Sequence, residues 1–479
     1  MREEKMSLLV RRLIYAFVVV MTVALSQPTN AQKYAITDLG TLGGTESFAY
    51  AINDSGDIIG YARYQGDTTS GPFLWSNGKM TDLNAYYGPE QGFYAGIMGN
   101  INNLGQIVGN SSDGHAVMLS QGEVTDLGTF GGDYASALGI NDLGQIVGYF
   151  ALPSGHHHAF LYTDGVMTAL GPFGEEAISV ATAINDSGMI TGFATDSYTV
   201  SARAFLYNNG IMTDISPFDS RESYARDINN HGQVAGEYLP YSGPFRCFVR
   251  SEHLISDLGT LAGIDCVALA INDQGEVVGS SPAVVGTEIS CDFETGMCYE
   301  YPVYSWHGFL YKNKRMIDLN ELIPSDSGWE LEWAYDINNK GQIVGYGTFG
   351  DPSVYRAFLL SPVTRTTIRI KPSHVFNKIN FKRGKKIPVA ILSSESFDAP
   401  GLVDKSSLTF GAVGDEASLI GCDRKQKDVN GDGLKDLVCK FSVRLAGFQC
   451  GDTEGILKAK MIDGTPIEGK DSVIIIPCK

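Results

Sequence analysis

A row of oxygen-bearing side chains lies near the C-terminus, in residues 428–436, which read Asp-Val-Asn-Gly-Asp-Gly-Leu-Lys-Asp. The alternation places the side-chain oxygens around one point, and it matches the pattern D-x-[DN]-x-[DN]-G of calcium-binding loops. Ca²⁺ takes roughly six to eight oxygen ligands, and the glycine after the third side-chain ligand permits the bend that gathers them. We therefore predict a structural Ca²⁺ bound by Asp428, Asn430, Asp432, the Leu434 carbonyl and Asp436.

The ligand shell of this loop is incomplete in the sequence. Cys439 occupies the twelfth position, where a glutamate would close the shell of a full loop. A carboxylate from elsewhere, Asp423 or Asp452, would have to complete it. The alternative is a plain turn, because Asp, Asn and Gly favour turns without any cation.

The eight cysteines form a second group with defined chemistry. An even number of cysteines favours disulfides over metal thiolates if the chain is exported, as the features of residues 1–31 described below predict, and no CxxC motif is present. The spacing does not fix the connectivity. Neighbours in sequence favour four pairs: Cys247–Cys266, Cys291–Cys298, Cys422–Cys439 around the calcium loop, and Cys450–Cys478.

Aromatic side chains gather in four long segments that we expect to be loops, residues 84–95, 237–244, 280–306 and 320–333. Aromatic faces beside carboxylates and amides suit sugar rings or peptide segments, although aromatics also bury large areas simply to hold loops in place. The candidate ligand-binding residues are Tyr86, Tyr87, Tyr94, Tyr238, Tyr241, Trp306, Trp329 and Trp333.

The run His156-His157-His158 is a weaker metal candidate. Adjacent residues on a strand point to opposite faces, so three consecutive histidines chelate poorly. His158 also belongs to a recurring position that holds His or Arg in six places. We expect this position to hydrogen-bond or pair with the recurring Asp of the neighbouring Asp-Leu-Gly type strand, as a stabilising contact across the repeat unit.

These candidates are positioned by a nonapeptide, I-N-[DN]-x-G-x-[IV]-x-G, that occurs seven times. It begins at Ile52, Ile101, Ile140, Ile184, Ile228, Ile271 and Ile337. Its Asn and first Gly are typical of a tight turn between two strands. Two further strands travel with each copy, one of the type His158-Ala-Phe-Leu161 and one of the type Asp126-Leu-Gly128. Four strands per roughly 40–45 residues is the spacing of a β-propeller blade.

The repeated His-Ala-Phe, Asp-Leu-Gly and Ile-Asn-Asp-x-Gly motifs resemble those of the HAF-repeat family of bacterial extracellular proteins, over about residues 34–360. The resemblance implies secretion and a repeat architecture, and it supplies no catalytic residues. The first unit departs from it, because Gly71-Pro72 replaces His-Ala.

The sequence therefore predicts an all-β protein with a seven-bladed β-propeller in residues 32–364. The first strand-like segment, residues 34–39, has no preceding partner, and the last, residues 356–360, has no following one. We expect the two to pair and close the ring, which removes two exposed sheet edges.

Residues 365–479 lack the repeat and contain short apolar runs, at 367–370, 386–392, 408–410, 436–441 and 473–476. Runs of this length, separated by turn residues, predict a smaller β-sandwich-like module. Through Ile387–Leu392, the calcium loop and Gly464–Gly469, it resembles C-terminal β modules of secreted bacterial proteins.

Residues 1–31 have the features of a signal peptide: Arg11 and Arg12, an apolar run from Leu13 to Leu25, and small residues ending at Ala31. The alternative is an uncleaved anchor. The chain has 54 acidic and 36 basic residues, a net charge of −18, which disfavours nucleic acid as a partner. We expect a secreted, periplasmic or extracellular protein with no transmembrane segment after cleavage.

No signature of a serine hydrolase, a zinc protease or a phosphate-binding loop is present in the sequence. The favoured function is a non-enzymatic binding or adhesion scaffold that recognises a glycan or a protein at the propeller face. The alternative is an extracellular carbohydrate-active hydrolase or lyase with its site at the channel mouth. The identity of the ligand and the oligomeric state do not follow from the sequence.

Overall fold

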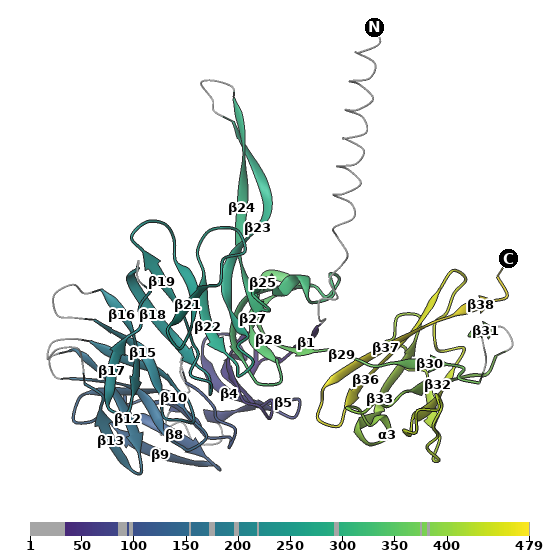
Figure 1. Ribbon diagram of the computed structural model, residues 1–479, viewed down its shortest axis with the longest axis horizontal. Helices are drawn as coiled ribbons and strands as arrows, with labels where there is room; N and C mark the ends of the chain where they lie inside the picture. Colours follow the sequence, from purple (N-terminus) through teal and green to yellow (C-terminus); the bar gives the residue numbers. More distant parts are fainter. Residues whose placement is uncertain are drawn as a thin grey trace, which may run out of the picture. The chain divides into compact units, whose positions relative to one another are not determined.

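The computed structural model describes residues 34–478 except 85–92, 95–98, 153–154, 172–177, 196–200, 218–219, 292–296, 374–375 and 381–383. The expected signal peptide, residues 1–31, therefore lies outside the described residues, as do Tyr86 and Tyr87. The described chain is all-β, with short helical turns at η1 (Leu319–Glu321) and α3 (Ala399–Leu402). Figure 1 shows the strands of residues 34–362 gathered into a succession of small antiparallel sheets.

Seven four-stranded sheets make up residues 34–362. The first sheet holds β2 (Gly43–Ile52), β3 (Ile58–Tyr64), β4 (Ser70–Ser76) and β5 (Lys79–Asp82), the second holds β6 (Phe93–Tyr94), β7 (Ile107–Ser111), β8 (Ala116–Ser120) and β9 (Glu123–Gly128), and the third holds β10 (Tyr134–Ile140), β11 (Ile146–Ala151), β12 (His157–Thr163) and β13 (Val166–Ala169). The fourth sheet holds β14 (Ser179–Ile184), β15 (Ile190–Thr195), β16 (Ala202–Asn208) and β17 (Ile211–Asp214), and the fifth holds β18 (Ser220–Ile228), β19 (Val234–Pro240), β20 (Arg246–Ser251) and β21 (Leu254–Asp257). The sixth sheet holds β22 (Val267–Ile271), β23 (Val277–Cys291), β24 (Cys298–Lys312) and β25 (Arg315–Asp318), and the seventh holds β26 (Trp329–Ile337), β27 (Ile343–Phe349), β28 (Asp351–Pro362) and β1 (Tyr34–Asp38).

The seventh sheet joins the two ends of this region. β1 pairs antiparallel with β28, from Tyr34 opposite Pro362 to Asp38 opposite Phe358. This is the pairing expected from the unpartnered first and last segments, and it confirms that prediction. The strand that begins the region thus completes the sheet that ends it.

The nonapeptide forms the turn between the first two strands of each sheet. In the third copy, Asn141 Oδ1 accepts the N–H groups of Leu143 and Gln145, at 3.1 and 2.9 Å. Gly144 has a φ of +76°, which a side chain would strain. The ninth residue, Gly148, has a different role, because a Cβ there would lie 1.9 Å from the carbonyl oxygen of Ser136 on the paired strand. The turn interpretation of Asn141 and Gly144 is confirmed.

A buried phenylalanine anchors six of the seven sheets from the third strand. These residues are fully buried between neighbouring sheets: Phe73, Phe160, Phe205, Phe248, Phe309 and Phe358. Each apolar cluster draws on adjacent sheets; one, for example, combines Leu39, Phe73 and Ala49 with Val344 and Leu359. The recurring His-Ala-Phe segment therefore serves packing between sheets, and burying each ring contributes roughly 2–3 kcal/mol.

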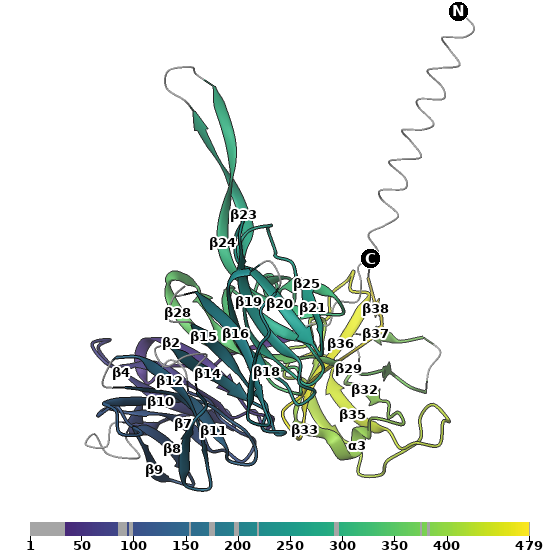
Figure 2. The same cartoon turned by 60° about the vertical axis from the view of Figure 1, so that its left-hand side comes forward.

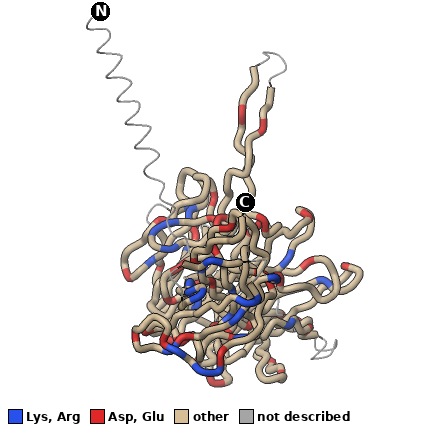
Figure 3. The backbone as a smooth tube through the Cα atoms, turned by 90° about the vertical axis from the view of Figure 1, so that its right-hand side faces the viewer, with Lys and Arg blue, Asp and Glu red and all other residues tan. Residues whose placement is uncertain are grey.

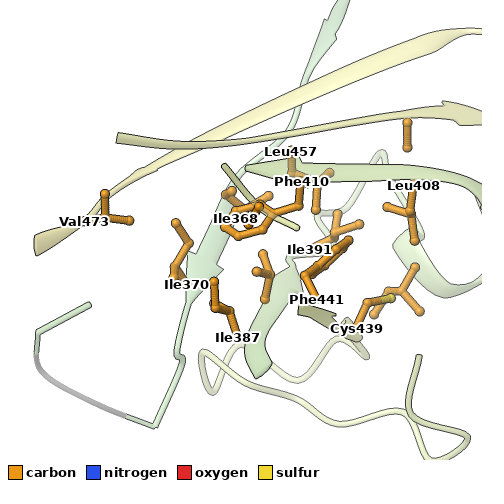
Figure 4. Packing of buried hydrophobic residues seen from close by; sticks show 14 of the residues in the cluster. Ile368, Ile370, Ile387, Ile391, Leu408, Phe410, Cys439, Phe441, Leu457 and Val473 are labelled. Carbon is orange, nitrogen blue, oxygen red and sulfur yellow. The ribbon is translucent and has the colours of Figure 1, made fainter. Parts of the chain in front are cut away.

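Residues 364–478 form a separate group of sheets. One holds β29 (Thr364–Arg365), β37 (Pro466–Ser472), β36 (Glu454–Met461) and β33 (Val403–Gly411). The second holds β30 (Ile368–Ile370), β32 (Lys386–Ile391), β35 (Leu437–Ser442) and β34 (Leu419–Cys422), and β31 (Lys378–Asn380) pairs with β38 (Ile474–Ile476). Both four-stranded sheets contribute to one apolar core (Figure 4). In this core the ring centroids of Phe410 and Phe441 lie 5.0 Å apart.

All four expected cysteine pairs are disulfides: Cys247–Cys266, Cys291–Cys298, Cys422–Cys439 and Cys450–Cys478. The first joins β20 to the segment before β22, and the second closes the tip of the β23–β24 hairpin. The other two lie in residues 364–478. Disulfides of this kind are typical of proteins that fold in an oxidising compartment. No helix among the described residues is long and apolar enough to cross a membrane.

Candidate functional site

The seven repeated turns meet in a closed circuit of hydrogen bonds. Each turn asparagine donates from Nδ2 to the backbone carbonyl of the corresponding asparagine in the next sheet, at 2.9–3.2 Å. The series runs through Asn53, Asn102, Asn141, Asn185, Asn229, Asn272 and Asn338, and Asn338 returns to Asn53. These seven side chains are buried. The repeated Asn thus shapes its own turn and also joins neighbouring sheets.

The next residue of each turn forms a second closed circuit. Its backbone N–H donates to the side-chain Oδ1 of the corresponding residue in the following sheet, at 2.7–3.0 Å. The members are Asp54, Asn103, Asp142, Asp186, Asn230, Asp273 and Asn339. Both circuits line a cavity of about 720 Å³, which includes space open to solvent.

Two further carboxylates line this cavity, Asp227 on β18 and Asp336 on β26. Asp227 accepts the N–H groups of Ile228 and Ile271, and Asp336 accepts those of Ile337 and Ile52, all at 2.8 Å. Burial raises the pKa of Asp227 to about 6. Burial, together with the charge of Asp227, raises the pKa of Asp336 to about 7. These groups therefore tie one sheet to the next and titrate near neutral pH.

A second candidate site is a set of seven partly exposed aromatic rings, which we call the aromatic patch. Trp306 stacks on Trp333 with ring centroids 5.3 Å apart, and Trp333 stacks on Tyr335 at 6.1 Å. Tyr335 contacts Tyr50 at 5.0 Å and Tyr346 at 5.9 Å. Phe48 and Tyr355 complete the patch, at 4.9 and 5.4 Å from Tyr346. The patch draws on β2, β24, β26, β27 and β28.

β-Bulges determine how two of these rings point. The register of the first two strands shifts around Tyr50 in one sheet and around Tyr335 in another. A bulge leaves one residue unpaired and turns its side chain out of the regular alternation. The same shift recurs in four more sheets, at Leu138, Thr182, Arg226 and Leu269. The bulged position therefore recurs in six sheets, and tyrosine occupies it in the first and last of them.

Acidic groups and a histidine lie beside the patch. His307 Nδ1 is 2.6 Å from Asp318, and its Nε2 is 3.4 Å from Glu330. Burial alone would lower the pKa of His307, but the hydrogen bond and charge of Asp318 and the charge of Glu330 outweigh it, so the pKa is raised. Burial, assisted by the charge of Glu330, raises the pKa of Glu332. The patch thus combines apolar ring faces with carboxylate hydrogen-bond acceptors.

The structure brings together two of the aromatic residues predicted from the sequence, Trp306 and Trp333. Both lie on strands, not in the expected loops, because Trp306 belongs to β24 and β26 begins at Trp329. Trp329 packs against the core instead, stacking on Phe349 at 5.0 Å and contacting Phe358.

The remaining predicted aromatics lie elsewhere. Tyr238 belongs to strand β19, not to a loop, and its ring contacts Phe248 at 6.2 Å. Tyr241 lies beyond this strand and is 72% exposed. Tyr94 belongs to β6, and its side chain is not described. Sequence reasoning missed Phe48, Tyr50, Tyr335, Tyr346 and Tyr355, because it searched the loops and not the strands.

The recurring His or Arg pairs with the recurring Asp as expected in five sheets. The pairs are His115–Asp126, Arg203–Asp214, Arg246–Asp257, His307–Asp318 and Arg356–Asp38. The contact joins adjacent strands of one sheet. In the first sheet the Tyr64 hydroxyl donates to Asp82 instead, at 3.0 Å. A Cβ at Gly71 would lie 2.0 Å from that hydroxyl, which explains the departure there from His-Ala.

The loop expected to bind calcium is held by its own side chains. Asp428 accepts the N–H groups of Gly431 and Gly433, at 2.6 and 2.9 Å, and these bonds lower its pKa. Asp432 accepts the Leu434 N–H at 2.8 Å. Asp436 is fully buried, and its two oxygens accept the N–H groups of Ser393 and Val429. The loop is therefore closed at its base by Asp436, and its outer oxygens face solvent.

The two carboxylates considered for completing the shell have partners of their own. Asp423 accepts from Lys440 Nζ, and Asp452 accepts the Gln449 N–H at 2.7 Å. Within the described residues, no cluster of three or more His, Cys, Asp and Glu side chains is arranged to hold a metal ion. The expected calcium shell also includes the Asn430 side chain and the Leu434 carbonyl, which are not His, Cys, Asp or Glu side chains.

No protein-family model matches the chain, and no curated protein matches it. Solved structures match it weakly. A fungal alcohol oxidase of the AA5 family in complex with copper has a TM-score of 0.39 at 12% identity, covering 93% of this chain and all of that one. A putative TolB from Agrobacterium tumefaciens has a TM-score of 0.37 at 13% identity, covering 60% of this chain and 95% of that one. A puromycin-hydrolyzing peptidase of Mycobacterium tuberculosis has a TM-score of 0.40 at 10% identity, with 67% and 51% covered. At these values the similarity carries no assignment of function.

Proposed function

We propose that this protein is a secreted binding scaffold of the HAF-repeat type, in which residues 34–362 form a seven-bladed β-propeller and residues 364–478 form a sandwich-like module. Support for the propeller comes from the seven four-stranded sheets and from the asparagine circuit that returns from Asn338 to Asn53. Support for export comes from the four disulfides.

The ligand we propose for the aromatic patch is a glycan. The observation that carries this proposal is the continuous series of partly exposed rings from Trp306 through Trp333 and Tyr335 to Tyr346. Such rings offer flat apolar faces to the C–H groups of a sugar, and Glu330 and Glu332 offer acceptors for its hydroxyls. The net charge of −18 disfavours an anionic polysaccharide, so we expect a neutral or cationic one.

Replacing Trp333 with alanine should weaken glycan binding about tenfold, because roughly 1–2 kcal/mol of ring contact is lost at the centre of the patch. The test is a glycan array on the mature chain, followed by calorimetry on the strongest ligand. Phe130→Ala is the matched control, since Phe130 is exposed and lies outside the patch. Equal affinities of the Trp333 variant and the wild type would rule the patch out as the binding site.

The alternative, a carbohydrate hydrolase or lyase, has one specific observation in its favour. Glu332 has a raised pKa and lies near Glu330, as an acid and base pair would require. Product analysis of the bound glycan distinguishes the two functions. Cleavage by the wild type that is lost in Glu332→Gln would establish the enzyme, whereas an intact glycan on both proteins supports the scaffold.

We also propose that residues 428–436 bind a structural Ca²⁺ through Asp428, Asn430, Asp432 and the Leu434 carbonyl, with Asp436 fastening the loop to Ser393, which follows β32. The donor set fits, because hard cations prefer carboxylate, amide and backbone oxygens. When bound, the cation would offset the mutual repulsion of the acidic side chains. The exposed position of Asn430 and Asp432 leaves these oxygens accessible to a cation.

Calcium at about ten times its dissociation constant should raise the melting temperature of the C-terminal module by about 4–8 °C, and chelation should reverse the change. Asp432→Ala should remove this dependence and leave the transition of residues 34–362 unchanged. Asp463→Ala is the control, because Asp463 also closes an exposed turn, through the Thr465 N–H. Identical calorimetric traces with calcium and with chelator would contradict the site.

A further inference from the structure

Strands β23 and β24 continue as a two-stranded hairpin well beyond their own sheet (Figures 1 and 2). β23 pairs with β22 only over residues 277–280, and β24 pairs with β25 only over residues 309–312. The two strands pair with each other as far as Cys291 opposite Cys298. We call residues 284–291 and 298–304 the arm.

The arm exposes apolar side chains on both strands. Ile289 is 72% exposed, Val284 55%, Tyr301 53% and Tyr299 51%. A two-stranded hairpin without a core is marginally stable in water, and here the Cys291–Cys298 disulfide ties its end. An apolar surface that is held in one conformation and kept out of the core marks an interaction site.

The backbone of the arm offers two edges. Among the described strands, none pairs with the outer edge of β23 beyond Ser280 or with that of β24 before Phe309. An exposed edge recruits an extended segment of another chain by strand addition, in which main-chain hydrogen bonds supply affinity and alternate side chains supply specificity.

The side chains of the arm specify the charge of that segment. Tyr299 and Tyr301 share one face, with ring centroids 6.5 Å apart, and Glu288 lies opposite Tyr301. Glu300 lies opposite Ile289 on the other face. The sequence has no Lys or Arg between residues 277 and 311. In Figure 3 the charged positions coloured on the projecting hairpin are all acidic. Tyrosine faces and carboxylates both attract ammonium and guanidinium groups.

We propose that the arm is a docking edge for an extended cationic polypeptide segment, which adds as a strand and places Lys or Arg side chains against Tyr299, Tyr301, Glu288 and Glu300. A second arm is the disfavoured occupant, because two such edges would bring like charges together. The site lies outside the aromatic patch and does not depend on glycan binding.

The test measures fluorescence anisotropy of short labelled peptides with the full mature chain. The probes are a peptide of alternating lysine and valine, the same peptide with glutamate for lysine, and the lysine peptide with alternate backbone nitrogens methylated. The lysine peptide should bind about tenfold more tightly than either of the others, since the glutamate peptide reverses the charge and methylation removes the strand hydrogen bonds. Equal binding of the methylated and unmethylated peptides would overturn strand addition.

Two variants locate the contact. Ile289→Ser combined with Tyr299→Ser and Tyr301→Ser should weaken binding about tenfold at unchanged net charge. Val166→Ser combined with Ile211→Ser, at exposed positions on β13 and β17, is the control and should bind as the wild type does. Glu288→Gln with Glu300→Gln keeps the apolar surface and should still weaken binding severalfold. Unchanged binding in either arm variant would overturn the proposal, as would a dimer in sedimentation analysis that the arm variants abolish.

Discussion

Replacing Asn338 with alanine is expected to lower the free energy of unfolding by about 3 kcal/mol. The Asn338 side chain is buried and makes four hydrogen bonds, accepting from Lys340 and Gln342 N–H and donating to Gln342 Oε1 and the Asn53 carbonyl. Alanine removes all four and leaves buried backbone groups without partners, and each such loss costs about 1 kcal/mol or more. The bond to Asn53 also closes the circuit between the last and first sheets, so its loss weakens the seam that joins the chain ends.

Equilibrium denaturation with urea measures this effect as a shift of the midpoint at constant slope. Lys340→Ala provides the control, because Lys340 lies in the same turn with an exposed side chain. A loss below about 1 kcal/mol for Asn338→Ala, or an equal loss for Lys340→Ala, would show that the circuit contributes little to stability.

The repeat made much of residues 34–362 predictable from sequence. The Asn and the first Gly of the nonapeptide determine the turn through local hydrogen bonds and a positive φ, as at Asn141 and Gly144. The unpartnered segment at Tyr34 could be matched to its partner at residues 356–362 by counting strands. The disulfides were also accessible, because each links cysteines close in sequence within one module.

The candidate site was less accessible, because it depends on distances between units. Tyr50 and Tyr335 are separated by most of the chain and meet only because the first and last sheets are neighbours. Their bulged positions break the alternation on which strand prediction depends. Trp306 and Trp333 were selected for being aromatic, but the pattern did not show that residues 280–291 and 298–306 form paired strands instead of a loop.

In the C-terminal module, apolar runs predicted β30, β32, β33, β35 and β38, whereas β36 and β37 were among the strands that were missed. β37 reads Pro-Ile-Glu-Gly-Lys-Asp-Ser and buries only Ile467 and Gly469. Gly469 lies against Ile368, so a strand with a small residue at a close contact gives little hydrophobic signal.

The stability of residues 34–362 is expected to fall by roughly 4 kcal/mol as the pH rises from 5 to 8, because Asp227 and Asp336 must ionise in the folded state. Their pKa values in the folded protein are about 6 and about 7, above the value of about 4 for an unfolded aspartate. Between these values the folded state binds more protons than the unfolded state, so unfolding becomes easier as protons are removed. The effect is absent below about pH 3, where the aspartates are protonated in both states, and complete above about pH 8, where they are ionised in both states.

Asn100 shows that asparagine can replace aspartate at this position of the repeat, which suggests the variant for testing this expectation. It precedes Ile101 as Asp227 precedes Ile228, and its Oδ1 accepts the Ile101 N–H as the aspartates accept theirs. Asp227→Asn with Asp336→Asn therefore keeps the local bond and removes the titration, although the amide loses the acceptor for Ile271 and Ile52. Urea midpoints across pH 5–8 should slope downward for the wild type and be flatter for the double variant. Parallel slopes would assign the pH dependence to groups other than these two carboxylates.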